Sequence, residues 1–268
     1  MTQVVLFVLA LFAAPWIVDW ILSFLLPPPS GDLSSFLARF VPSIWMPTVI
    51  ALLFVRIADG AAGVRDELKA RLGYRRHSGR WVIVAGVVPM LAMLVAVVSA
   101  RRAGDSAAFI SANAVPSMIA LQVITGAVGE EFGWRGFLLT RLSKRVGQMR
   151  AAWVMAMLWS LWHVPAWFDP ALPHRTMPMI PTLSFILFFG VFLAFVFNRA
   201  GESVVATIAA HLSLNIMTGF GGVQLSSTVF WGALAAIFGV LAVLITLGSR
   251  TPPLDRQPLD TIRPAPTS

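Results

Sequence analysis

Long apolar runs with almost no charged residues recur along this sequence and restrict its fold more than any other feature. A helix needs about 20 such residues to cross the hydrocarbon core of a bilayer. The apolar residues in these runs are continuous rather than alternating, which favours helices over the strands of a barrel. Only 12% of the residues are charged, whereas soluble domains carry roughly 25%. We therefore expect an all-α, polytopic bundle of transmembrane helices.

Eight transmembrane helices are predicted from these runs. They cover residues 4–26, 40–55, 81–100, 116–142, 151–168, 179–197, 203–219 and 228–247. No change in composition divides them, so we expect one membrane-embedded domain over residues 1–249. Residues 250–268 are polar and rich in proline, which predicts a disordered cytoplasmic tail.

Lysine and arginine are concentrated in alternate connections between the predicted helices. Because cytoplasmic connections are enriched in these residues, the pattern places both termini in the cytoplasm. The net charge of +8 is interpreted as a topology signal, and no nucleic-acid partner is expected. Arginine greatly exceeds lysine, which hints at a GC-rich bacterial genome, so the predicted location is a bacterial cytoplasmic membrane.

One of the basic connections, residues 64–80, has an amphipathic pattern. Val64, Leu68 and Leu72 recur every four residues and form an apolar stripe on a basic helix. We expect this helix to lie along the cytoplasmic surface of the membrane.

Ionisable side chains inside the apolar segments are the main functional signal, because a charged group in the membrane core costs roughly 2.5 to 3.5 kcal/mol on insertion scales. Glu131 and Arg135 are four residues apart, which predicts an ion pair within one helix. Glu130 is rotated by about 100° from Glu131. It is therefore free to face another helix as a candidate general base.

Two further segments carry polar residues at a similar predicted depth. His163 stands alone on its helix, whereas His211 and Asn215 are four residues apart and share a helix face. A histidine and a carboxamide directed at one reacting group could stabilise an oxyanion. The sequence therefore predicts a buried site built from three helices that are distant along the chain.

These three segments resemble the motifs of a known family. EEFGWR (130–135), WSLWH (159–163) and HLSLN (211–215) are similar to the EExxxR, FxxxH and HxxxN motifs of the CPBP intramembrane proteases. That family includes the type II CAAX prenyl endopeptidases and Abi-like proteins of bacteriocin processing or immunity. The motifs occur in the family order within residues 122–220, and Trp159 stands where the family usually has phenylalanine.

The resemblance implies an intramembrane endopeptidase that hydrolyses a peptide bond with activated water. Under it, Glu130 activates the water with help from His163, and His211 with Asn215 forms the oxyanion site. The predicted ion pair would support these residues. Substrate is expected to reach the site from the cytoplasmic side.

The cofactor and the substrate remain open. Family members are often called metalloproteases, and a metal-free glutamate mechanism has also been argued. Zinc held by Glu130, His163 and His211 is therefore the alternative to a metal-free site. The expected partners are the lipid bilayer and a peptide or protein substrate, with or without a prenyl group.

Two other functions are also open. The buried glutamates and histidines could relay protons in a proton-coupled transporter or channel. A non-catalytic immunity protein could keep the motifs for binding alone. The sequence shows no duplicated halves, and this absence weighs against the transporter.

Overall fold

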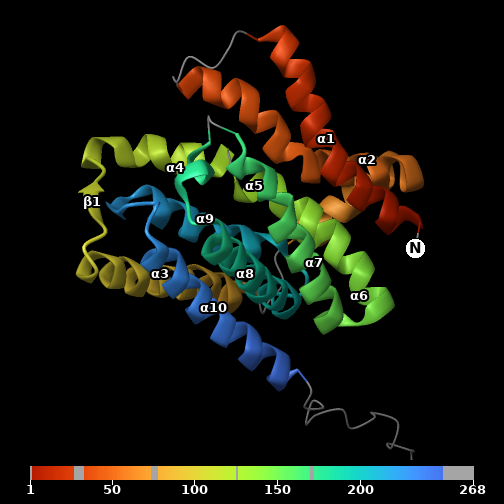
Figure 1. Ribbon diagram of the computed structural model, residues 1–268. Coiled ribbons are helices and arrows are strands. Elements are labelled where there is room, and N and C mark those ends of the chain that lie inside the picture. The colour runs from red at the N-terminus through yellow and green to blue at the C-terminus, as the bar shows by residue number, and fades with distance from the viewer. Residues whose placement is uncertain (1, 27–32, 74–77, 125, 170–171, 250–268) are drawn as a thin grey trace, which may run out of the picture.

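The computed structural model describes residues 2–26, 33–73, 78–124, 126–169 and 172–249, and within them it confirms an all-α membrane bundle (Figure 1). Six helical segments in these ranges are long and apolar enough to cross a membrane. Four of them agree with predicted helices to within three residues at each end: α1 (Thr2–Leu25), α3 (Ser78–Arg102), α8 (Met179–Arg199) and α10 (Thr228–Gly248). The predicted tail, residues 250–268, lies outside the described residues.

The outer surfaces of these helices are strongly apolar. Large hydrophobic side chains are exposed on α1, α3 and α10, among them Leu9, Trp20, Ile83, Leu91 and Leu244. Water-soluble proteins rarely expose apolar surface on this scale, whereas lipid tails would cover it without cost. The chain is therefore an integral membrane protein.

Two of the predicted membrane helices are short. α7 (Gln148–Trp162) has 15 residues and α9 (Val204–Gly219) has 16, compared with the roughly 20 needed for a full crossing. The prediction carried the helix of α7 on to residue 168. The structure ends it at Trp162, because Pro165 lacks an N–H and disfavours helix at the residue before it. The chain continues as a short 3-10 turn, η3 (Val164–Trp167).

The predicted single helix over residues 116–142 is wrong. The structure divides this region into α4 (Val115–Ile124), α5 (Ala127–Glu131), a π-helical stretch η2 (Phe132–Leu139) and α6 (Thr140–Val146). Gly126 separates α4 from α5 with φ −154° and ψ −111°, a conformation far from helical. π-helical turns are rare and occur frequently at functional sites.

α2 (Leu33–Leu72) is much longer than the predicted helix and includes residues 64–72 of the amphipathic connection. Gly60, with φ 71° and ψ −166°, kinks it. Beyond the kink, Val64 and Leu68 pack against the protein core. Val64 and Leu68 therefore contact the protein core, whereas from the sequence we expected them to face the membrane surface.

A buried arginine near the end of α2 fixes this second part of the helix to the rest of the protein. Arg71 pairs with Glu67 at 3.2 Å, measured from Nε to Oε1. Its Nη1 also lies 2.6 Å from Oε2 of Glu202, in the α8–α9 connection. α2 is thereby tied to the residues that precede α9.

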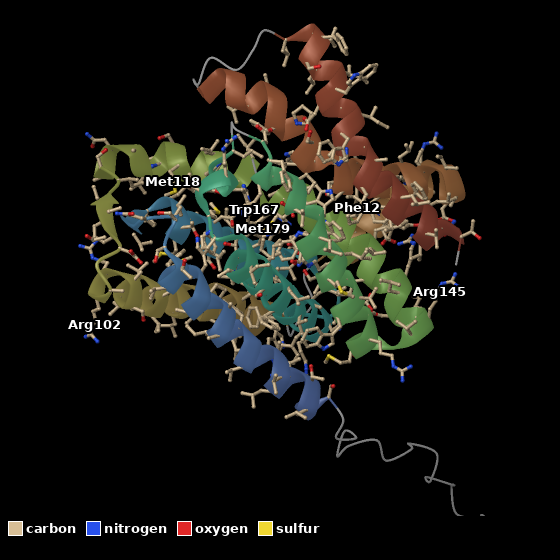
Figure 2. All side chains as sticks on the ribbon, viewed as in Figure 1. Phe12, Arg102, Met118, Arg145, Trp167 and Met179 are labelled. Carbon is tan, nitrogen blue, oxygen red and sulfur yellow. The ribbon has the colours of Figure 1, made fainter. Side chains whose placement is uncertain are left out.

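A two-stranded antiparallel sheet was not predicted. β1 (Ser106–Phe109) pairs with β2 (Gly221–Val223), with Ser106 opposite Val223. β1 lies at one end of the helical bundle, and the N-terminus and α6 lie at the other (Figure 1). The labelled side chains Arg102 and Arg145 mark the same two ends in Figure 2. The sheet therefore caps one end of an otherwise helical protein.

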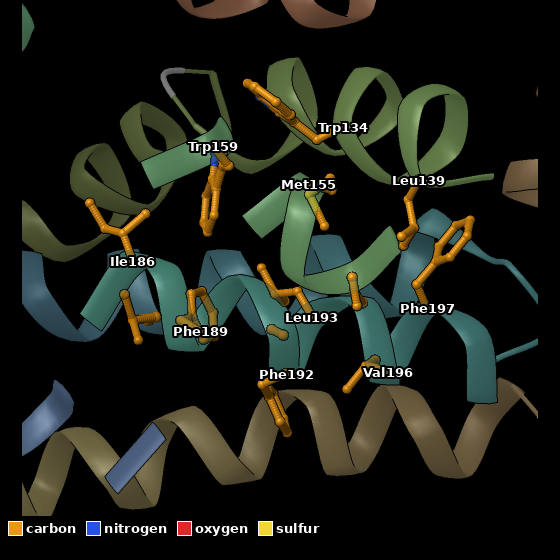
Figure 3. Packing of buried hydrophobic residues seen from close by; sticks show 14 of the residues in the cluster. Trp134, Leu139, Met155, Trp159, Ile186, Phe189, Phe192, Leu193, Val196 and Phe197 are labelled. Carbon is orange, nitrogen blue, oxygen red and sulfur yellow. The ribbon is translucent and has the colours of Figure 1, made fainter. Parts of the chain in front are cut away.

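The core is centred on α8, which packs against α7, α9 and α10. Figure 3 shows Phe189, Leu193 and Phe197 of α8 facing side chains of α7 and η2, including Trp159 and Leu139. All of these side chains are almost completely buried. Because α8 carries none of the motif residues, it acts as the scaffold against which the motif-bearing helices are packed.

Candidate active site

The side chain of Glu130 lies inside the bundle and has a hydrogen-bond partner that was not predicted from the sequence. The side chain is buried, and the indole Nε1 of Trp159 in α7 donates to its Oε2 at 2.7 Å. A phenylalanine at position 159 could not make this bond, because its ring has no donor. The departure from the usual family motif therefore adds a polar contact to the candidate general base. The indole N–H of Trp159 was the sequence feature from which this hydrogen bond to Glu130 could have been predicted.

The predicted ion pair of Glu131 and Arg135 is present and fully buried. Nη1 of Arg135 lies 2.8 Å from Oε1 of Glu131. The same oxygen lies 2.9 Å from Nδ1 of His211 in α9. An ionised carboxylate can only accept, so Nδ1 of His211 carries the proton. Glu131 thus orients His211 as well as balancing Arg135, a link that sequence spacing did not reveal.

His163 is held by the backbone at the end of α7. Its Nδ1 lies 2.7 Å from the carbonyl oxygen of Trp159. A carbonyl only accepts hydrogen bonds, so Nδ1 is the donor and Nε2 of the neutral ring is left as an acceptor. That tautomer suits a residue that takes a proton or binds a donor.

Trp159 is the common neighbour of these groups. Its ring centroid lies 5.4 Å from those of both His163 and His211, each ring edge-on. Cζ of Arg135 lies 4.1 Å from the centre of the same indole, within the range of a cation–π interaction. One tryptophan therefore contacts groups from α5, η2, α7 and α9.

A cavity of about 880 Å³ joins the predicted catalytic residues. Glu130, His163, His211 and Asn215 all line it, although they come from three separate segments of the chain. Glu131 and Arg135 are not among the residues that line the cavity. Aromatic side chains form much of the rest: Phe12, Trp16, Trp20, Phe40, Trp159, Trp162, Phe168, Phe185, Phe189 and Trp231.

The cavity lies toward the end of the bundle that is opposite the basic turns. Its walls use the second half of α1, the end of α7 and the first half of α8. The basic residues Lys144 and Arg145 in the last turn of α6 and Arg150 in the first turn of α7 are at the other end of α7. The charge pattern predicts that these basic residues are cytoplasmic. The cavity then lies nearer the opposite side of the membrane, which does not agree with the expected entry of substrate from the cytoplasm.

The zinc alternative requires Glu130, His163 and His211 to gather around one point. Over the ranges that the structure describes, no three histidine, aspartate or glutamate side chains gather in a way that could hold a metal ion. Oε2 of Glu130 accepts from Trp159, and both histidines donate from Nδ1, which leaves Oε1 of Glu130 and the two Nε2 atoms without a protein partner in these bonds. Glu130, His163 and His211 do not form a ligand set in this arrangement, so we derive no step through a metal.

The fold and this site together define a polytopic membrane protein with acid–base groups buried inside its helical bundle. Residues 112–217 match the family model described as type II CAAX prenyl endopeptidase Rce1-like. The match spans all three motifs and supports the assignment of this segment to the CPBP proteases. A search among curated proteins gave no match.

Proposed function

We propose that this protein is an intramembrane endopeptidase, acting in a bacterial cytoplasmic membrane, that hydrolyses a peptide bond with water activated by Glu130. The observation that carries the proposal is the shared cavity, which brings Glu130, His163, His211 and Asn215 together from distant segments. Apolar and aromatic walls around a few polar groups are typical of ligand sites. Such walls suit an apolar peptide or a peptide with a lipid-like group.

In the first step, Glu130 removes a proton from water as the water oxygen attacks the peptide carbonyl carbon. Trp159 holds one carboxylate oxygen of Glu130, which leaves the other oxygen to orient the water. His163 lines the same cavity and offers Nε2 as a second acceptor for the water. When the tetrahedral intermediate collapses, the C–N bond breaks and the protonated Glu130 returns its proton to the leaving amine.

The oxyanion that forms on the carbonyl oxygen needs hydrogen-bond donors. The carboxamide of Asn215 can donate whatever the protonation state of its neighbours. His211 can donate from Nε2 only when the ring is doubly protonated, because Nδ1 already carries its proton toward Glu131. We therefore assign Asn215 the constant part of the oxyanion site and His211 a part that depends on its second proton.

The test of this function is cleavage of defined peptides by purified protein in lipid vesicles. A library of prenylated peptides and a matched library without prenyl groups would be incubated with the wild type and with Glu130→Gln. Cleavage by the wild type alone supports the proposal, and the library that is cut identifies the substrate class. Proton or solute flux through the vesicles without cleavage of either library would favour a transporter instead.

Cleavage should persist in a strong membrane-permeant chelator. Because no ligand set gathers among the described residues, we assign the holding and activation of the water to Glu130 rather than to zinc. We expect chelated and untreated enzyme to differ by less than about twofold, whereas a zinc enzyme would lose the bound water whose pKa the metal lowers to about 7. Activity would be measured beside metal content by mass spectrometry. Stoichiometric zinc whose removal and return switch cleavage off and on would overturn the metal-free mechanism.

Gly126→Ala should impair catalysis by displacing Asn215. A Cβ at position 126 would lie 2.6 Å from Nδ2 of Asn215, so the carboxamide would have to move. Losing one oxyanion donor costs about 100-fold in kcat or more, and we expect a loss that approaches this value. Gly232→Ala in α10 is the matched control, because a Cβ there meets nothing within 4 Å. Wild-type kcat in Gly126→Ala would remove Asn215 from the oxyanion site.

A further inference from the structure

The connection between α7 and α8, which no motif marks, also contributes to the cavity. Between α7 and α8 the chain forms η3 and a second 3-10 turn, η4 (Pro173–Thr176). His174 in η4 lines the cavity together with His163. A third histidine is therefore present at the site, from a connection whose sequence resembles none of the family motifs.

The position of His174 is fixed by its own loop. Its ring packs edge-on against Trp167, with centroids 5.1 Å apart. Trp167 in turn donates from Nε1 to the carbonyl oxygen of Met177 at 2.9 Å, and the N–H of Met177 donates to the carbonyl oxygen of His174 at 3.0 Å. Figure 2 labels Trp167 in the middle of the molecule, away from both marked ends. The imidazole is thus placed before any ligand arrives.

The ring of His174 has an unused hydrogen-bonding atom. Its Nδ1 is buried and has no hydrogen-bond partner among the described residues. Buried polar atoms are rarely left unpaired, because each lost hydrogen bond is unfavourable. Burial lowers the pKa of His174 to about 4, and repulsion from His163 acts in the same direction. At neutral pH the ring is therefore uncharged, with one donor and one acceptor nitrogen.

His174 lies beside His163 without bonding to it. Their ring centroids lie 6.4 Å apart. A direct hydrogen bond between two imidazoles requires centroids within about 5.5 Å, so these rings do not bond to each other. Nε2 of His163 is assigned to the attacking water, whereas the acceptor nitrogen of the neutral His174 ring has no assigned partner. A peptide N–H is the donor that every peptide substrate carries, and it can bond to that acceptor.

From this arrangement, and resting on the proposed peptidase function, we propose that His174 is a substrate-binding residue that hydrogen-bonds the peptide backbone beside His163. It contacts the substrate rather than the attacking water. Its loss therefore weakens binding of substrate and transition state alike, which raises KM and leaves kcat nearly unchanged.

The test compares His174→Phe and His174→Gln. Phenylalanine keeps the aromatic contact with Trp167 and removes the hydrogen bond, whereas glutamine supplies both a donor and an acceptor. Binding would be measured in the hydrolysis-deficient Glu130→Gln background by energy transfer from the cavity tryptophans to a dansyl-labelled Leu–Ala repeat peptide. We expect His174→Phe to weaken binding about tenfold and His174→Gln to recover most of it. Arg175→Gln, the exposed neighbour in the same turn, should bind like the parent protein.

A backbone N-methylated version of the peptide completes the design. It lacks N–H groups, so it should bind the parent weakly, and His174→Phe should cost it little further affinity. Unchanged affinity of His174→Phe, or an equal loss for both peptides, would overturn the assignment, as would a fall in kcat with KM unchanged. If the wild type binds the peptide without cleaving it, the proposed peptidase function is contradicted. The measured affinities would still test the role of His174 in binding.

Discussion

Glu130→Gln should abolish peptide cleavage without disturbing the fold. The glutamine oxygen can still accept the hydrogen bond from Trp159, so the buried contact at 2.7 Å is kept. The amide cannot take a proton from water, and removing a positioned general base costs about 10²- to 10⁴-fold. The measurement is single-turnover cleavage of a peptide from the cleaved library, with the folded yield after detergent extraction recorded beside it.

Glu202→Gln provides a matched control for this experiment. It makes the same substitution at a glutamate that pairs with Arg71 and does not line the cavity. We expect it to retain nearly full activity, because the Glu202 side chain is partly exposed and Arg71 keeps its second partner, Glu67. Turnover of Glu130→Gln at the rate of this control would exclude Glu130 as the base.

Arg135→Met should sharply lower the amount of folded protein. The substitution leaves Glu131 ionised at a site with no exposed surface. Removing one partner of a buried pair costs about 3 to 5 kcal/mol, a large part of the 5 to 15 kcal/mol that typically holds a domain together. Adding Glu131→Gln should restore most of the folded yield, since no charge then remains unpaired. Thermal unfolding in detergent would measure both variants.

Double variants at Glu131 and Arg135 separate the effect of the ion pair on protein stability from the effect of Glu131 on the orientation of His211. Glu131→Gln with Arg135→Met keeps an acceptor for Nδ1 of His211, whereas Glu131→Leu with Arg135→Met removes it. Both double variants lack the charges, so we expect both to fold. Only the glutamine version should retain substantial cleavage, because its His211 is still oriented. Equal activity in the two would reduce Glu131 to a purely structural role.

Sequence patterns predicted a structural feature correctly where that feature depended on a single helix. Apolar runs located α1, α3, α8 and α10, because each of these helices has a continuous lipid-compatible length. Spacing of four residues predicted the contact between Glu131 and Arg135, because one turn of helix brings such residues together. The motifs identified four of the polar residues that line the cavity: Glu130, His163, His211 and Asn215.

Features that depend on contacts between distant segments could not be predicted. The division of residues 116–142 belongs to this group, because α5 and η2 approach α2 so closely that a Cβ on Gly133 would strike the carbonyl of Pro47. The hydrogen bond from Trp159 to Glu130 joins residues 29 apart, and the contact of Arg71 with Glu202 joins residues 131 apart. Sequence periodicity within one helix cannot predict contacts between residues so far apart in the chain. The roles assigned to the catalytic residues stay predictions until they are measured.

The walls of the cavity are built from residues both inside and outside the segment that matches the family model. The acid–base groups lie within residues 112–217, the segment that matches the family model. Phe12 and Trp16 of α1 and Ser43 of α2 lie outside that segment and line the same cavity. Changes in the first two helices can therefore reshape the space offered to a substrate while every group that handles a proton stays in place. Substrate preference and hydrolytic chemistry can thus diverge independently in this architecture.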